Sequence, residues 1–256
     1  YRSTQNILSA ANSVIVKNTS HPVLKLWTQN PKGGKIKLYT AKNGLEEASF
    51  VIDEVDSLLK LGFGLKDVAV LYRTNAQSRV LEEALLHEGI PYVLVGGIRF
   101  YGRKEVKDVL SFFRFLVNPK DSVSRRRIEK LGKRRFEKAK ELQKSMENPE
   151  ASTTLDILDA VLEKTGYLEL YQKETEENLA RLENIKELRS VGAEFPSVHE
   201  FLENVALVEA EQNEKGNIQS YSLEKKDAVT LMTLHAAKGL EFAVVFIVGM
   251  EEGLFP

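Results

Sequence analysis

The sequence lacks several features that would place it in a special class. It has no cysteine among its 256 residues, which excludes a disulfide scaffold and a thiolate metal site and fits a reducing compartment. No apolar run reaches membrane-spanning length, and no signal peptide is visible. The formal net charge is −1, so the chain as a whole is not a polycation. Any contact with nucleic acid must therefore come from local placement of charge.

Common catalytic patterns are also missing. There is no G-x-x-x-x-G-K-[ST] phosphate loop, and no Ser–His–Asp or Cys–His arrangement can be argued. Gly96-Gly97 lacks the dinucleotide-binding fingerprint. His235 has no second histidine or carboxylate at metal-ligand spacing, so a metal site there is not favoured.

What is present is a soluble globular pattern, with 43% hydrophobic and 29% charged residues. Strands and helices alternate over the first 117 residues, and two apolar strands return near the other end. Alternating apolar strands and helices predict an α/β fold, with a parallel sheet covered by helices on both faces. The predicted helices are 4–18 (with Ser3 or Thr4 as N-cap), 45–61, 76–88 and 104–117, and the predicted strands are 36–39, 68–72, 91–95, 229–233 and 244–248.

The middle of the chain has a different pattern. Residues 118–225 show long helical patterns and no convincing strand. A basic block, 125–144, holds ten Lys and Arg against three Glu, and an acidic block, 147–214, holds seventeen Asp and Glu against five Lys and Arg. We therefore expect an α/β domain in two pieces, 1–117 and 226–256, interrupted by an all-helical insertion. The chain begins inside an apparent helix cap and ends just after a strand, so we expect an excised fragment.

Three segments carry candidate chemistry. Tyr1-Arg2 at a helix start could clamp a phosphate while the ring stacks on a base, although an Arg on a surface carboxylate with Tyr in the core is at least as good a reading. The segment 70–79 puts Arg73, Thr74 and Asn75 at the carboxyl end of a buried strand, the edge where α/β sheets bind ligands. The alternative there is helix capping by Thr74 or Asn75, with Arg73 and Arg79 on a solvated face.

The third segment, 231–242, also runs from a strand into polar and small residues. Small residues at this point let another chain approach the backbone closely. By themselves, these residues indicate an α/β domain with a ligand-bearing sheet edge and a helical insertion.

Together these segments resemble the UvrD/PcrA/Rep group of superfamily 1 DNA helicases. Residues 1–8 resemble the NYRS motif without its leading Asn, and 70–79 resemble the VLYRTNAQSR motif. Residues 89–108 resemble the linker into the insertion, and 231–256 resemble motif V and its sequel, with Ala243 in place of the usual proline. The resemblance implies a RecA-like, P-loop NTPase-like second motor domain that ends before the last motif.

The resemblance also implies roles for single residues. ATP would lie between two RecA-like domains, of which the missing first one holds the phosphates and Mg²⁺. Tyr1 would stack on adenine, and Arg2 would act as an arginine finger, a group that contributes roughly 10³–10⁵ in rate. Glu241 would contact the ribose, with Gly239 allowing close backbone approach. Single-stranded DNA would lie along Arg73, Thr74, Asn75 and His235, with Thr233 as a weaker candidate.

The activity implied is ATP-driven 3′ to 5′ movement on single-stranded DNA and unwinding of duplex in repair or replication. The partners implied are single-strand/duplex junctions, the N-terminal RecA-like domain and repair or transcription proteins, in the bacterial cytoplasm at the nucleoid and not at a membrane. Without a phosphate loop, we expect this fragment alone neither to hydrolyse ATP nor to unwind DNA. A non-catalytic partner-docking module and a fragment of an AddA/RecB-type helicase–nuclease are the alternatives.

The insertion departs from the family pattern. It is shorter than usual, and the Arg-Gly-Ile-Gly turn expected near 133–136, which helps the family hold duplex DNA, is absent. The chain either lacks this turn or omits residues near Arg127 or Asn217. The basic run 125–144 could contact duplex phosphates instead, and a solvated helix face is an equally good explanation.

Overall fold

The computed structural model describes residues 3–17, 26–146, 152–214 and 227–255. Contacts divide the chain into two compact units, Tyr1–Lys42 and Asn43–Pro256.

The first unit contains helix α1, Gln5–Ile15. Thr4 is its N-cap residue, as predicted, but its side chain makes no capping hydrogen bond. The first-turn amides of Gln5 and Asn6 donate instead to the carbonyl oxygens of Pro31 and Lys32, at 3.3 and 3.1 Å. The helix ends three residues before the predicted residue 18, because residues 16–17 already form a turn.

The predicted strand at 36–39 is wrong. No residue of the described stretch 26–42 belongs to a strand, and Ile36 and Leu38 are 61% and 90% exposed. An apolar alternation becomes a strand only where a neighbouring strand accepts its backbone hydrogen bonds, and no described residue of this unit supplies one.

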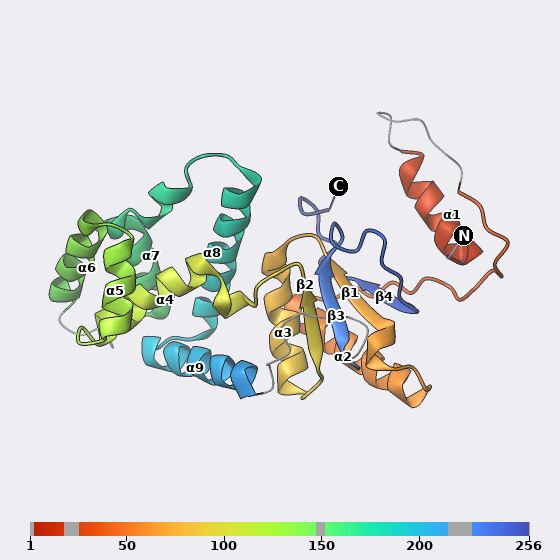
Figure 1. The fold of residues 1–256 in the computed structure, drawn as a ribbon, viewed down its shortest axis with the longest axis horizontal. Helices are drawn as coiled ribbons and strands as arrows, with labels where there is room; N and C mark the ends of the chain where they lie inside the picture. Colours follow the sequence, from red (N-terminus) through yellow and green to blue (C-terminus); the bar gives the residue numbers. More distant parts are fainter. Residues whose placement is uncertain (1–2, 18–25, 147–151, 215–226, 256) are drawn as a thin grey trace. The chain divides into compact units, whose positions relative to one another are not determined.

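The second unit begins with alternating helices and strands, continues through a run of helices and ends with two strands (Figure 1). Its helices are α2 (Gly44–Lys60), α3 (Ser78–His87), α4 (Lys104–Val117), α5 (Ser122–Lys130), α6 (Lys133–Ser145), α7 (Thr154–Thr165), α8 (Glu176–Glu194) and α9 (Val198–Glu214). Its 3₁₀ helices are η1 (Leu65–Asp67), η2 (Asn75–Gln77), η3 (Phe100–Gly102) and η5 (Tyr167–Tyr171). Its strands are β1 (Val68–Tyr72), β2 (Tyr92–Val95), β3 (Val229–Thr233) and β4 (Val244–Ile247).

The four strands form one sheet in the order β2-β3-β1-β4, and every neighbouring pair is parallel. β1 is buried along its whole length, as its continuous apolar run predicts. β3, which comes after the helical part of the chain, lies between β1 and β2, which come before it. The fold is therefore the predicted α/β sheet interrupted by helices.

Helices α2 and α3 pack on one face of the sheet through a shared apolar core (Figure 1). α2 begins at Asn43, whose side-chain oxygen accepts from the amide of Glu46 at 2.9 Å, and it buries Ala48, Val51 and Val55. The other face has a smaller core of three buried residues, Ala69, Leu71 and Met232.

β4 was predicted as a buried strand, and that prediction is wrong for half of its residues. Val245 and Ile247 are 46% and 48% exposed. β4 is the last strand in the sheet, and the described residues cover only one of its faces.

The helical part of the chain has its own apolar core, separate from the core of the sheet. α4 contributes many of its largest members, among them Phe112, Phe113 and Phe115, whose rings contact aromatic side chains of η5, α9 and α6, respectively. α4 therefore packs as part of the helical cluster. Within the described residues, no helix is both long and apolar enough to cross a membrane.

Candidate nucleic-acid interface at the carboxyl edge of the sheet

The pairing of β1 with β3 joins the second and third candidate segments. Tyr72, the last residue of β1, lies opposite Thr233, the last residue of β3. The amide of Leu234 donates to the carbonyl oxygen of Tyr72 at 2.9 Å, one residue beyond the ladder. The residues that follow each strand therefore leave the sheet side by side, at the edge where parallel α/β sheets bind ligands.

Gln77 shapes the segment after β1. Its side-chain oxygen accepts from the amides of Arg73 and Thr74, both at 2.9 Å. Its side-chain nitrogen donates to the carbonyl oxygen of Gly249, just beyond β4, at 3.3 Å. The amide of Gly249 in turn donates to the carboxylate of Glu47 on α2, at 2.9 and 3.1 Å. One side chain thus ties the end of β1 to the end of β4.

The three predicted DNA contacts in this segment differ in exposure. Arg73 is exposed, Asn75 is half-buried, and the hydroxyl of Thr74 is buried without a hydrogen-bond partner among the described residues. Arg73 is therefore the side chain that this segment offers most openly to a phosphate. As the alternative predicted, Thr74 is the N-cap residue of η2, but its side chain makes no capping hydrogen bond, and Gln77 accepts the amides of Arg73 and Thr74 instead.

The segment after β3 is a tight turn of small residues. The hydroxyl oxygen of Thr233 accepts from the amide of Ala236 at 3.2 Å, and its carbonyl oxygen accepts from the amide of Ala237 at 3.1 Å. The side chain of Thr233 thus builds the turn, and His235 is exposed on it. Gly239 has a φ of +88°, with open space where a side chain would start, and Glu241 is exposed two residues later.

Gly96 and Gly97 bring the end of β2 against both segments. A Cβ atom on Gly96 would lie 3.7 Å from Cβ of Ala236, and one on Gly97 would lie 3.5 Å from Oδ1 of Asn75. Gly96 also has a φ of +72°, a conformation that favours glycine. Gly96 and Gly97, which do not form a dinucleotide-binding fingerprint, therefore belong to the same carboxyl edge of the sheet.

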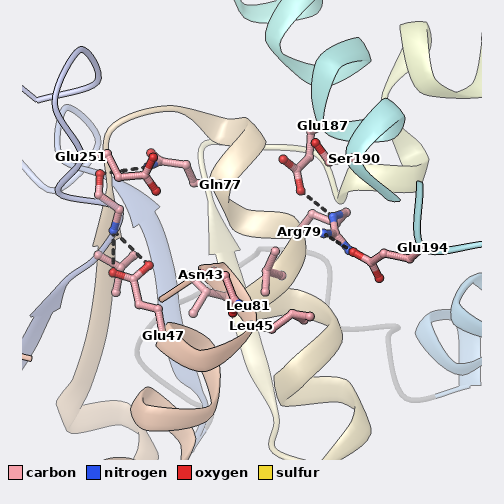
Figure 2. Close-up of a pocket in the computed structure, with 14 residues that line it drawn as sticks. Asn43, Leu45, Glu47, Gln77, Arg79, Leu81, Glu187, Ser190, Glu194 and Glu251 are labelled. Atoms are coloured by element: carbon pink, nitrogen blue, oxygen red, sulfur yellow. Dashed lines mark hydrogen bonds and ion pairs between the residues drawn. The ribbon is translucent and has the colours of Figure 1, made fainter. Parts of the chain in front are cut away.

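A cavity of about 420 Å³ lies beside this edge, between α2, the end of β4, α3 and α8 (Figure 2). Its charged lining is mainly acidic, from Glu47, Glu187, Glu194 and Glu251. Carboxylates at this density repel phosphate groups. The cavity therefore does not suit a nucleotide or a nucleic-acid backbone, and the exposed edge beside Arg73 and His235 suits one better.

Arg79 lines the same cavity, but its charge is already neutralised. It is 3% exposed, donates to Glu187 on α8 at 2.6 Å and to Glu83 at 2.7 Å, and lies 3.9 Å from Glu194. Burial alone would lower its pKa, but Glu83 and Glu187 hold the pKa above its ordinary value. The alternative that put Arg79 on a solvated face with Arg73 is wrong for Arg79 and right for Arg73.

The described residues form no group of three or more His, Asp and Glu side chains arranged to hold a metal ion. Tyr1 and Arg2, predicted to bind ATP, lie outside the described residues. Gly239 and Glu241, the other predicted nucleotide contacts, follow β3 in the second unit.

The parallel sheet, its polar carboxyl edge and the helices inserted before β3 define a RecA-like α/β domain with a helical insertion. The family profile for the UvrD-like helicase C-terminal domain matches residues 1–178 and 136–256. The chain belongs to that family.

Curated relatives agree with this assignment. The whole chain aligns with the ATP-dependent DNA helicase PcrA of Staphylococcus aureus and of Bacillus subtilis, at 38% identity over 305 residues, covering 40% and 41% of those proteins. PcrA of Staphylococcus epidermidis is 37% identical over 308 residues. The chain thus spans about two fifths of the length of the relatives it matches. The alignments are longer than 256 residues, so the relatives contain residues in this region that the chain lacks.

Two structurally important residues were not among the predicted site residues. Gln77 organises the segment after β1, and Arg103 donates to the carbonyl oxygen of Asn75 at 2.9 Å. A signal for Gln77 was present, since Thr74-Asn75-Ala76-Gln77 fits the T-x-x-Q pattern of a capping box. No local signal identifies Arg103, because its partners come from three separate stretches of the chain.

Proposed function

We propose that this chain is the second motor lobe of an ATP-dependent helicase that moves 3′ to 5′ along single-stranded DNA and unwinds duplex in repair or replication. One observation carries the proposal: β1 and β3 are neighbours, so the segments that follow them form one exposed polar edge. That edge belongs to a domain of the UvrD-like helicase family, and the relatives named above are ATP-dependent DNA helicases.

The proposed DNA contacts are Arg73, Thr74, Asn75, Thr233 and His235. Arg73 and His235 are exposed at neighbouring strand ends, which suits contact with successive phosphates and bases. Such contacts hold the backbone and the base faces, so they bind the strand without reading its sequence. The proposed substrates are single strands and single-strand/duplex junctions. Duplex phosphates are proposed as partners of the basic run 125–144 on α5 and α6, although five of its cations, Arg125, Arg127, Arg134, Arg135 and Lys140, already pair with carboxylates.

The proposed nucleotide contacts are Tyr1, Arg2, Gly239 and Glu241, with the phosphates and Mg²⁺ held by a first motor domain. The open space and positive φ at Gly239 support close approach of a ligand to the backbone there. ATP binding would close the two motor domains and hydrolysis would release them, so that each cycle moves the strand. Repair or transcription proteins in the bacterial cytoplasm are the further partners proposed.

The domain division 1–117, 118–225 and 226–256 stays a proposal as well. Its support is the interruption of the sheet between β2 and β3. Because α4 packs into the helical core, the packing boundary lies nearer to Phe100 than to residue 118.

Binding of a fluorescent oligothymidine to the purified chain, measured by anisotropy over a range of salt concentrations, tests the DNA proposal. Arg73→Ala should weaken binding and reduce the slope of log affinity against log salt by about 0.7, the value for one lost phosphate contact on a single strand. Lys66→Ala is the matched control, because Lys66 is also exposed but precedes the amino end of β1. Equal effects of the two variants would refute an interface at the carboxyl edge.

The nucleotide proposal has separate tests. The isolated chain should show no ATP turnover, with or without DNA, and DNA-stimulated turnover would contradict the proposal. In the full-length protein, Arg2→Ala should abolish most DNA-stimulated turnover, because an arginine finger contributes roughly 10³–10⁵ in rate. Near-normal turnover in that variant would refute the finger role.

A further inference from the structure

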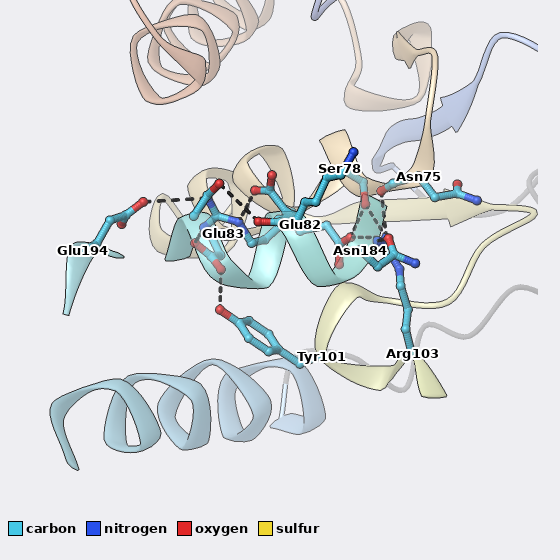
Figure 3. A network of polar contacts seen from close by, with 12 residues as sticks. Asn75, Ser78, Glu82, Glu83, Tyr101, Arg103, Asn184 and Glu194 are labelled. Atoms are coloured by element: carbon cyan, nitrogen blue, oxygen red, sulfur yellow. Dashed lines mark hydrogen bonds and ion pairs between the residues drawn. The ribbon is translucent and has the colours of Figure 1, made fainter. Parts of the chain in front are cut away.

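Arg103 lies where the sheet meets the helical part of the chain. It is 6% exposed and precedes α4 directly. Its Nη2 atom donates to the carbonyl oxygen of Asn75 at 2.9 Å and to the hydroxyl of Ser78 at 2.8 Å. Its Nη1 atom donates to Oδ1 of Asn184, on α8, at 2.6 Å (Figure 3). Its Nε atom donates to the carbonyl oxygen of Ile98 at 3.0 Å.

The planar, rigid guanidinium of Arg103 therefore joins the segment 75–78, which follows β1, to helix α8. Its donors have a fixed fork geometry, so the group cannot shift toward one acceptor without leaving another. Asn184 is itself fixed, since it is 5% exposed and its side-chain nitrogen donates to Glu105 on α4. A movement of α8 therefore displaces the carbonyl of Asn75 or leaves a buried donor without a partner, and the second alternative is costly.

A second contact holds the same helix to the same segment. Arg79, one residue after Ser78, binds Glu187 of α8, and Glu83 accepts from both Arg79 and the hydroxyl of Tyr101 (Figure 3). Two α8 residues, three positions apart on one helix face, thus act on this segment: Glu187 binds Arg79 of α3 directly, and Asn184 acts through Arg103.

The position of Asn75 depends on this network. Its carbonyl oxygen accepts from Arg103, and its side-chain oxygen faces the backbone of Gly97, where a Cβ atom would lie 3.5 Å away. The residue is thus held between the end of β2 and Arg103, next to the exposed Arg73.

We propose that Arg103 is a positioning residue that holds Asn75 in the position in which it contacts single-stranded DNA. Because Arg103 also binds Asn184, the DNA affinity of the carboxyl edge depends on the position of α8. This inference rests on the proposed function, because it assumes that Asn75 contacts DNA. It goes further by naming the residues through which the helical insertion regulates the grip on the strand.

The first test needs no DNA. Asn184→Ala removes the α8 acceptor without changing charge, and hydrogen–deuterium exchange of the peptide 73–79 is measured by mass spectrometry. Exchange should become at least about threefold faster, the factor for losing one modest hydrogen bond. Asn178→Ala is the matched control, since Asn178 also lies on α8 but donates to Lys173 within the helical part. Unchanged exchange in Asn184→Ala, or equal acceleration in the control, would overturn the proposal.

The second test uses oligothymidine and a double-mutant cycle. Arg103→Lys keeps the charge but loses the fork, and it should weaken binding by roughly 3- to 10-fold, the range for one hydrogen bond, with an unchanged salt slope. In an Asn75→Ala background, Arg103→Lys should have almost no further effect, because Arg103 acts through Asn75. Independent effects of the two substitutions would overturn the proposal.

The two tests separate this inference from the function on which it rests. If Asn75→Ala and Arg73→Ala leave DNA binding intact, the proposed interface fails, whereas the exchange result still decides whether α8 controls the segment. If those variants weaken binding but Arg103→Lys and Asn184→Ala do not, the interface stands and the positioning role fails.

Discussion

Gln77 offers the sharpest test of how the carboxyl edge is built. Its side chain makes three hydrogen bonds, with the amides of Arg73 and Thr74 and with the carbonyl oxygen of Gly249. The substitution Gln77→Met keeps the length of the side chain and removes all three. Any loss of stability in this variant therefore reports hydrogen bonds more than lost volume.

The magnitude follows from the burial of the three partners. Arg73 is exposed, so its amide can bind water after the substitution. Thr74 is half-buried and Gly249 is buried, so the Thr74 amide and the Gly249 carbonyl lose their partner with little compensation. At about 1 kcal/mol for each of these two bonds, Gln77→Met should lower the free energy of unfolding by about 2 kcal/mol.

Urea unfolding followed by circular dichroism measures this difference. Gln143→Met is the matched control, because Gln143 is half-buried on α6 and none of its side-chain atoms has a hydrogen bond in the described part of the chain. The control should stay within about 0.5 kcal/mol of the unsubstituted chain. A Gln77→Met variant that is as stable as the control would refute the reasoning.

Two further predictions concern the helical part. Asp121 caps α5 through the amides of Val123 and Ser124, and the hydrogen bond from the Ser124 hydroxyl, followed by smaller contributions, lowers its pKa below 3.8. The stabilisation that the Asp121 carboxylate gives the fold is therefore present above the pKa that this group has in the unfolded chain. It is lost as the pH falls through the lower pKa that the group has in the folded chain. Asp121→Ala should lower the free energy of unfolding by about 1 kcal/mol at pH 7. In urea unfolding experiments at a pH below the usual Asp pKa, the difference in unfolding free energy between this variant and the unsubstituted chain should become smaller. A difference that does not change with pH would contradict this prediction. Phe112 is fully buried, with its ring centroid 6.0 Å from that of Tyr167. Phe112→Ala should therefore lower the free energy of unfolding by about 3–5 kcal/mol in the same assay. Val123→Ala, at a 76% exposed position, is the control and should change this free energy by less than about 0.5 kcal/mol.

The sequence predicted those elements whose signal is local. β1 and α4 have the predicted bounds, because a continuous apolar run and a strong helical periodicity each identify one structure. The predicted strand at 36–39 failed because strand formation depends on a partner that the pattern does not contain. The exposure of Val245 and Ile247 depends on the place of β4 in the sheet, which the strand's own residues do not specify.

The same distinction holds for the candidate site. Strand ends rich in polar residues identified the segments after β1 and β3, and the pairing of these strands brings those segments together. The partner of Arg79, Glu187, is 108 residues away in the sequence, so no local pattern could predict its burial. The roles proposed for Tyr1, Arg2, Gly239 and Glu241 came mainly from the resemblance and stay predictions.

The strand order has a consequence for how the chain folds. β3 lies between β1 and β2, and it is made only after the whole helical part. Until β3 arrives, β1 and β2 cannot complete their hydrogen bonding, and each has an open edge to which another strand could add. Sheets with such distant partners form slowly, because the loop between them must close first. We therefore infer that the helical part folds first during synthesis, and that the edge with Arg73 and His235 is completed last.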